Sequence, residues 1–341
     1  MEPIEAKEKI EGKLNIVIMW FGELWQWFYD ILNHTNSNVY VVSISWRNDA
    51  LYTQHWVKAY NWYEWFPVSY EDIDAVLLCC RTNQLDKVST LIPKSILPKV
   101  ISKMISFQNW FGVKEKLMQL FWKSPARCIP YLSFKCYNGK DINLTFAKPS
   151  PIKSWDEASI KKIINLINDY TSDTFWMYLF EWVDSIALQR DGEYKAIINS
   201  VLNSLCVIYK WDVAKSMNKF EKEFGANWLL ERSKEISCIL NSRFNWIFET
   251  NPWEVKYRIE NIAQKFAKEK PSTYNQYYEQ ANQRGKILSE DNHLLGYIIQ
   301  QSRLKWIIAP ISDIIRWRMK DIEKQINMNI KPFWFNQNLV S

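Results

Sequence analysis

Residues 14–32 read LNIVIMWFGELWQWFYDIL and give the clearest indication of the fold. The stretch opens with the apolar run 14–19, which is typical of a parallel strand that is buried on both faces. After a turn, the apolar side chains of residues 24–32 repeat at the spacing of an amphipathic helix. A buried strand that leads through a tight turn into a helix is the opening unit of a doubly wound α/β domain.

Further segments extend this pattern along the chain. Short apolar runs predict more strands at residues 38–44, 74–80, 99–107, 127–135 and 142–147. From about residue 187, long segments with a period of 3.6 residues predict helices at 193–208, 212–224, 227–246, 253–269 and 291–328. We therefore expect an N-terminal doubly wound sheet in residues 1–186, followed by an all-helical domain in residues 187–341.

Glycine is scarce in this sequence and tryptophan is abundant, with 8 Gly and 19 Trp among 341 residues. Glycine usually makes up about 7% of a protein, and it serves in turns because it reaches positive φ without a steric cost. The two residue types together come close to that usual share. The counts raise the hypothesis that some Trp residues stand where the fold needs glycine.

The remaining composition excludes several classes of protein. The net charge of +6 is mild and spread along the chain, whereas a nucleic-acid-binding protein concentrates its basic residues in a patch. No apolar run is as long as a membrane span, and the charged start of the chain is unlike a signal or transit peptide. We therefore expect a cytoplasmic protein that binds neither nucleic acid nor membranes.

The cysteines and histidines argue against a metal site. The six cysteines, at positions 79, 80, 128, 136, 206 and 238, show no C-x-x-C spacing, and there are only three histidines. We expect no bound metal and interpret the cysteines as buried free thiols in a reducing cytoplasm.

The turn after the first strand reads WFGELW, where a dinucleotide-binding turn has G-x-G-x-x-G. Its residues are Trp20, Phe21, Gly22, Glu23, Leu24 and Trp25. The glycines of that motif make the turn tight, bring backbone N–H groups close to the pyrophosphate and let the helix pack on the sheet. Two interpretations stay open: an aromatic turn without a ligand, or a full fingerprint, GFGELG, if both Trp positions are glycine.

Two segments near the ends of predicted strands combine polar and turn residues. Residues 74–85 read DAVLLCCRTNQL. They are similar to a family pattern, D-x-V-x-x-x-x-K-x-x-Q, which is discussed below, but have Arg81 in place of its Lys. This exchange keeps the charge but not the reach of the side chain. Residues 107–112 read FQNWFG, similar to a Q-N-G-x-G turn that contains Asn109, with Trp110 at the first glycine.

Lys195, Asn199 and Asn203 are spaced i, i+4 and i+8, so they share one face of a helix. Such a stripe can simply face solvent. Here the neighbouring positions are apolar, so we expect the stripe to line an interdomain cleft, where its polar groups need partners.

Three segments of the second half match sequence patterns of one known protein family. Residues 195–203 read KAIINSVLN and match K-x-x-x-N-x-x-x-N, residues 271–274 read PSTY, similar to P-S-M-Y, and residues 289–297 read SEDNHLLGY, similar to T-E-I-D-Y-L-N-G-Y. In this order, together with the turns of the first half, these segments resemble the ketopantoate reductase (2-dehydropantoate 2-reductase) family. The resemblance spans roughly residues 13–320, with a short N-terminal extension and about five extra residues between 272 and 290.

The resemblance implies a Rossmann-type NADP-binding domain followed by an all-helical substrate-binding and catalytic domain. It implies NADPH-dependent reduction of 2-dehydropantoate (ketopantoate), or of a related 2-keto acid, as in pantoate biosynthesis. Lys195 is then the general acid, and Glu290 binds the substrate hydroxyl and places Lys195. Substrate binding is implied for Asn199, Asn203 and Ser272. A homodimer is compatible with this assignment.

The cofactor assignment rests on the end of the second predicted strand. An NAD site usually has an acidic residue about 20 residues after the glycine turn. Residues 43–47 offer no acid, and Arg47 is suited to a 2′-phosphate. The resemblance further implies that Arg81 and Asn109 line the cofactor site, and we expect NADPH.

Several Trp residues fall at glycines of the family pattern: Trp20, Trp25, Trp110, Trp211 and Trp306. The favoured hypothesis is that the codon UGA was translated as Trp where the source organism reads it as Gly. The alternative is a catalytically inactive member of the same fold that acts as a binding or scaffold protein. An aromatic, basic nucleic-acid-binding module is disfavoured, because the Trp residues follow turns rather than one basic face.

Overall fold

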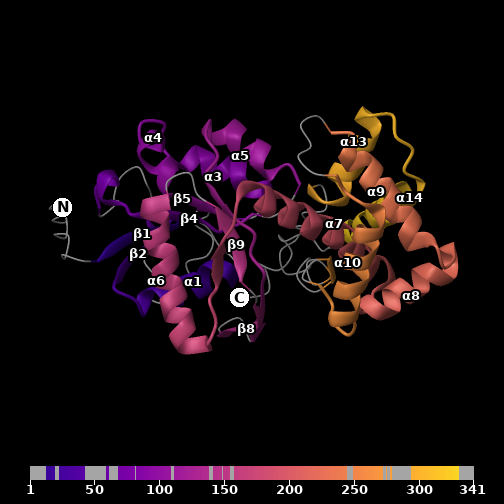
Figure 1. Ribbon diagram of the computed structural model, residues 1–341, viewed down its shortest axis with the longest axis horizontal. Helices are drawn as coiled ribbons and strands as arrows, with labels where there is room; N and C mark the ends of the chain where they lie inside the picture. Colours follow the sequence, from indigo (N-terminus) through magenta and orange to yellow (C-terminus); the bar gives the residue numbers. More distant parts are fainter. Residues whose placement is uncertain are drawn as a thin grey trace, which may run out of the picture. The chain divides into compact units, whose positions relative to one another are not determined.

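The computed structural model divides into two compact units, Met1–Asp191 and Gly192–Ser341 (Figure 1). The residues that it describes are 13–19, 23–42, 59–60, 68–80, 82–108, 111–137, 141–147, 149–153, 157–243, 249–271, 274, 277–278 and 293–329. The backbone alone is described for residues 23–26, 59–60, 83, 133–137, 141–147 and 157–159.

The described strands of the first unit form an eight-stranded sheet in the order β10-β9-β6-β5-β4-β1-β2-β3. Their bounds are β1 Leu14–Met19, β2 Ser37–Val42, β3 Ala59–Tyr60, β4 Ala75–Leu78, β5 Met104–Ser106, β6 Ala126–Cys128, β9 Ser150–Lys153 and β10 Phe180–Trp182. Neighbours run parallel except β6 and β9, which pair antiparallel. A separate antiparallel hairpin pairs β7 (Leu132–Tyr137) with β8 (Asp141–Ala147).

The stretch β3-β2-β1-β4-β5-β6 has the strand order of a Rossmann-type doubly wound fold. The chain leaves β1 toward β2 and β3 on one side, and then crosses to β4 on the other. Strands β1 and β4 therefore flank the topological switch point of the sheet. The predicted Rossmann-type sheet, with its opening strand at 14–19, is confirmed.

Helices cover both faces of this sheet, because successive side chains of β1 point to opposite sides. Ile16 and Ile18 belong to one core with α1 and α6, and Val17 and Met19 belong to the other with α3, α4 and α5 (Figure 1). The bounds of these helices are α1 Glu23–Asn33, α3 Leu85–Leu91, α4 Leu97–Val100, α5 Val113–Phe121 and α6 Glu157–Phe175. Burial on both faces explains why the central strands are near-continuous apolar runs in the sequence.

The regular elements described in the second unit are all helices, as predicted. Helix α7 starts just before the division of the chain, and α9 packs against α10, α13 and α14 (Figure 1). The bounds are α7 Ser185–Tyr209, α8 Val213–Phe224, α9 Trp228–Asn241, α10 Pro252–Lys265, α13 Leu295–Leu304 and α14 Pro310–Asn329. Helix α9 therefore lies at the centre of contacts within this unit.

Some predicted boundaries are wrong. In the predicted strand 99–107, helix α4 and a 3-10 turn come first and only β5 is strand, because Leu97, Val100 and Ile101 are buried at helical spacing. Proline divides two other predicted elements, since it interrupts a regular backbone. Pro130 lies between β6 and β7, and Pro310 begins α14.

Candidate active site

The carboxyl ends of β1 and β4 lie side by side at the switch point, where ligands of open α/β sheets bind. Met19 pairs with Leu78 across the two strands, and the Cys79 N–H donates to the Met19 carbonyl at 3.1 Å. Helix α1 begins at Glu23, four positions after the last residue of β1. The strand and the helix therefore flank the residues of the predicted cofactor turn.

The structure places only part of the predicted cofactor-binding set. The backbone of Glu23, Leu24 and Trp25 forms the first turn of α1, whose N–H groups lack intrahelical partners and carry partial positive charge. Such a helix start binds phosphate groups. The other predicted cofactor residues lie outside the described residues: Trp20, Phe21, Gly22, Arg47, Arg81 and Asn109.

Gln108 joins the ends of β4 and β5, next to Asn109 in the chain. Its buried Nε2 donates to the carbonyls of Leu78 at 2.9 Å and Cys80 at 2.7 Å, and its Oε1 contacts the Ser106 hydroxyl. The side chain therefore fixes the backbone at this edge of the sheet. The motif at 107–112 includes Gln108 but could not reveal this role, because its partners lie 28 and 30 residues away.

In the second unit, the polar stripe lies on α7 at the predicted spacing. Lys195 and Asn199 are half-buried, and Asn203 is buried. Of the apolar residues that flank the stripe, Ile198 is half-buried. The others are buried: Ala196, Ile197, Val201, Leu202 and Leu205. A Lys and two Asn on a helix packed in this way form a candidate site for a polar, anionic ligand. The remaining predicted site residues, Ser272 and Glu290, lie outside the described residues.

An ion pair holds the turn of α7 that carries Lys195. Arg243 Nη2 donates to Glu193 Oε1 at 3.0 Å, and Arg243 Nη1 donates to the Tyr297 hydroxyl at 3.0 Å. Both partners of the ion pair are only 12% exposed, so water screens it less than it screens a surface pair. Because Glu193 lies two residues before Lys195, this contact fixes the helix backbone beneath the stripe.

Asp184 caps the start of α7. Its Oδ1 accepts hydrogen bonds from the backbone N–H groups of Ile186 at 2.7 Å and Ala187 at 2.9 Å. These hydrogen bonds lower the pKa of the Asp184 carboxyl below its usual value. An aspartate immediately before a helix is a recognised sequence signal for such a cap.

We expect Asp184→Ala to lower the melting temperature at neutral pH, because two N–H groups of the first turn lose their acceptor. Since folding lowers the pKa of Asp184, the stabilisation is present above the unfolded pKa and is lost as the pH falls through the folded pKa. The difference between variant and wild type should therefore shrink in acid. Thermal unfolding followed by circular dichroism across this pH range measures it.

Asp184→Asn is the control, because asparagine is also a good capping residue. Its melting temperature at neutral pH should stay near that of the wild type. If it were as unstable as Asp184→Ala, capping would not be the reason.

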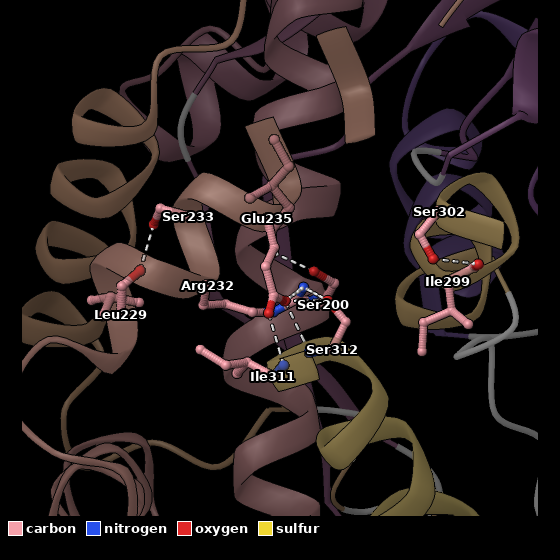
Figure 2. A network of polar contacts seen from close by, with 10 residues as sticks. Ser200, Leu229, Arg232, Ser233, Glu235, Ile299, Ser302, Ile311 and Ser312 are labelled. Carbon is pink, nitrogen blue, oxygen red and sulfur yellow. Dashed lines mark hydrogen bonds and ion pairs between the residues drawn. The ribbon is translucent and has the colours of Figure 1, made fainter. Parts of the chain in front are cut away.

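A second polar cluster connects α9 to the start of α14 (Figure 2). Glu235 accepts hydrogen bonds from the backbone N–H groups of Ile311 at 2.8 Å and Ser312 at 3.0 Å, and from the Ser312 hydroxyl at 2.8 Å. Arg232 is fully buried, contacts the Ser312 hydroxyl and lies 3.5 Å from Glu235. Burial lowers the pKa of Arg232 to about 10. The cluster contains none of the predicted site residues and stabilises the helical unit.

The cysteines whose side chains the structure describes are free thiols: Cys79, Cys80, Cys128 and Cys206 are buried as expected, but the expectation is wrong for Cys238, which is exposed. Burial raises the pKa of Cys206 to about 12 and that of Cys79 well above its usual value, so these two thiols are protonated at neutral pH. Among the described residues, no group of three or more His, Cys, Asp or Glu side chains could hold a metal ion. None of the described helices is both long and apolar enough to cross a bilayer.

No protein-family model matches the sequence, and no curated protein matches it significantly. Solved structures do match. A PanE/ApbA family ketopantoate reductase from Ralstonia eutropha JMP134 aligns with a TM-score of 0.69 at 16% identity, over 92% of this chain and 99% of its own. A D-mandelate dehydrogenase in complex with NADH aligns with a TM-score of 0.70 at 15% identity, over 92% of this chain and 100% of its own.

A dimeric ketopantoate reductase from Staphylococcus aureus aligns with a TM-score of 0.59 at 16% identity, over 92% of this chain and 100% of its own. These alignments cover both the sheet with its switch point and the helices that follow it. The chain therefore has the fold of the ketopantoate reductases, from the first strand of its sheet to its helical second half.

Proposed function

We propose that this protein is an NADPH-dependent oxidoreductase that reduces ketopantoate, or a related 2-keto acid, to the 2-hydroxy acid. The observation that carries the proposal is the stripe of Lys195, Asn199 and Asn203 on helix α7, flanked by the buried side chains of Ala196, Ile197, Val201, Leu202 and Leu205, in a chain with the fold of these reductases. The D-mandelate dehydrogenase neighbour was solved with NADH, which supports a nicotinamide cofactor.

The sheet fits a dinucleotide. The strand order β3-β2-β1-β4-β5-β6 puts the start of α1 beside the switch point, and free N–H groups at a helix start are suited to a pyrophosphate. Residues 20–25, Arg81 and Asn109 are proposed to hold the cofactor. When bound, NADPH supplies the hydride that reaches the keto carbon.

Lys195 is proposed to donate the proton that completes the reduction. Negative charge develops on the keto oxygen during the reaction, and a cationic ammonium group both stabilises that charge and provides the proton at Nζ. Glu290 is proposed to accept a hydrogen bond from the substrate hydroxyl and to orient Lys195. Asn199, Asn203 and Ser272 are proposed to bind the polar groups of the substrate, Ser272 its carboxylate.

The proposal includes a homodimer in a reducing cytoplasm. The dimeric Staphylococcus aureus neighbour supports the first part, and the buried free thiols support the second. The inactive binding or scaffold protein remains the second candidate, because Trp20 and Trp25 occupy the glycine positions of the cofactor turn.

The decisive experiment follows NADPH consumption with ketopantoate and a panel of other 2-keto acids, for the chain as written and for a Trp20→Gly/Trp25→Gly variant. Turnover by the variant supports the reductase. If neither protein binds NADPH in a titration or reduces any acid of the panel, the proposal is wrong. NADPH binding without turnover by either protein would favour the inactive binding protein.

Arg47 provides a test of the cofactor preference. Replacing it with Asp should raise KM for NADPH by roughly tenfold or more, because a hydrogen-bonded charge pair with the 2′-phosphate is lost, while KM for NADH changes far less. Steady-state kinetics with both cofactors measure the difference. Equal effects on the two cofactors would refute the role of Arg47.

A further inference from the structure

The helix ends of this protein contain an unusual set of residues with left-handed backbone. Among the described residues, four that are not glycine have φ between +56° and +62°: Trp122, Trp176, Lys210 and Trp306. This region favours glycine, and a bulky residue in it is an outlier. Tryptophan fills 19 of the 341 positions in the chain, yet it fills three of these four.

Trp306 has the hydrogen bonds of a glycine-terminated helix end. After α13 ends at Leu304, the Trp306 N–H donates to the Arg303 carbonyl at 3.3 Å and the Ile307 N–H donates to the Ser302 carbonyl at 2.9 Å. This is the Schellman pattern, in which the residue at the position of Trp306 is usually Gly because it must be left-handed. The backbone here therefore has the conformation that glycine adopts without strain.

Trp122 and Trp176 also follow helices with left-handed backbone. Trp122 follows the last residue of α5 with φ 62° and ψ −21°. Trp176 follows the last residue of α6 with φ 57°, and its N–H donates to the Ser172 carbonyl at 3.0 Å. At both ends the chain leaves the helix through a left-handed residue, which is the usual position of a helix-terminating glycine.

The indoles at these three positions gain little from packing. They are 70%, 93% and 94% exposed in Trp122, Trp176 and Trp306, so burial does not offset the cost of the backbone. By contrast, Trp228 is 3% exposed and its ring lies 4.8 Å from that of Phe220. Trp27 is 5% exposed in the core of the first unit. Neither residue is left-handed.

We infer that the native protein carries glycine at positions 122, 176 and 306 and genuine tryptophan at positions 27 and 228. The codons of the first three would then be UGA, read as Gly in the source organism, and those of the last two UGG. Backbone conformation identifies Trp122 and Trp176 as glycine positions, although the family pattern in the sequence did not point to them. For Trp211 the conformation gives no such support, since the left-handed residue at the end of α7 is Lys210.

The test is peptide mass spectrometry of the protein purified from its own organism. Peptides that span positions 122, 176 and 306 should have the mass of glycine, and those that span 27 and 228 the mass of tryptophan. Tryptophan at the three left-handed positions, or glycine at the two buried ones, would overturn the inference. The result does not depend on the proposed enzymatic activity, because it reads the covalent structure alone.

The stability of the chain as written gives a second readout. Replacing Trp122, Trp176 or Trp306 with Gly should each raise the folding equilibrium constant, by roughly threefold to tenfold, because the left-handed penalty is removed. Trp317→Gly is the matched control, since its side chain is as exposed as that of Trp122, at 70%, but lies within α14. It should lower the constant by roughly twofold. A loss of stability in all three left-handed variants would contradict the inference.

Discussion

Lys195→Met is expected to lower kcat for NADPH-dependent keto-acid reduction by about 10²–10⁴-fold, the usual contribution of a general acid. The variant retains an apolar stem of similar length on α7 but has no proton to donate and no positive charge to stabilise the developing alkoxide. NADPH binding should remain, because the predicted cofactor residues belong to the other unit. Steady-state kinetics and a separate cofactor titration measure the two effects.

The control for this variant is Lys222→Met. Lys222 is an exposed residue in the last turn of α8, so removing its charge should leave kcat nearly unchanged. The rate of the wild type should fall at high pH, because the general acid loses its proton there. This fall should be absent from the pH–rate profile of Lys195→Met. Full activity of Lys195→Met would remove Lys195 from the mechanism.

The second large effect is expected for Glu235→Ala, which should destabilise the helical unit by about 3–5 kcal/mol. The substitution leaves the fully buried Arg232 without its nearest carboxylate and deprives the first N–H groups of α14 of their acceptor. Urea unfolding should show a lower midpoint with an unchanged slope, which indicates a change in stability alone.

The same helix provides a matched control. Glu231 pairs with Lys234 at 2.7 Å over the same i,i+3 spacing, but both side chains are more than half exposed. Glu231→Ala should cost no more than about 1 kcal/mol, because water screens an exposed pair. Equal losses in the two variants would show that burial of Arg232 does not determine the effect.

The periodicity of apolar residues correctly predicted elements that are buried in one uniform way along their length. The strand at 14–19 and the helix after it could be predicted because both faces of that strand are covered. Periodicity failed in the predicted strand 99–107, where the end of α4, a 3-10 turn and β5 follow each other within a few residues and all contain buried apolar residues. Chain order also could not reveal that β9 turns back antiparallel to β6, since pairing direction depends on the path of the loop between strands.

The candidate site could be predicted to the extent that it is local in sequence. The i, i+4, i+8 spacing placed Lys195, Asn199 and Asn203 on one stripe of α7. The supports of the site involve distant partners: Gln108 reaches back to β4, and Glu193 pairs with Arg243 50 residues later. Such contacts depend on how the elements pack, and no single segment encodes them.

The cap that Glu235 places on α14 has a consequence for the order in which the protein forms during synthesis. Its partners, Ile311 and Ser312, are translated 76 and 77 residues after it. Until they leave the ribosome, α9 carries a charged pair and an apolar face that later helices must cover, whereas the sheet unit is already complete in sequence. Contacts between residues so far apart form slowly. The helical half can therefore complete this packing only after residues 311 and 312 have been synthesised, later than the sheet unit.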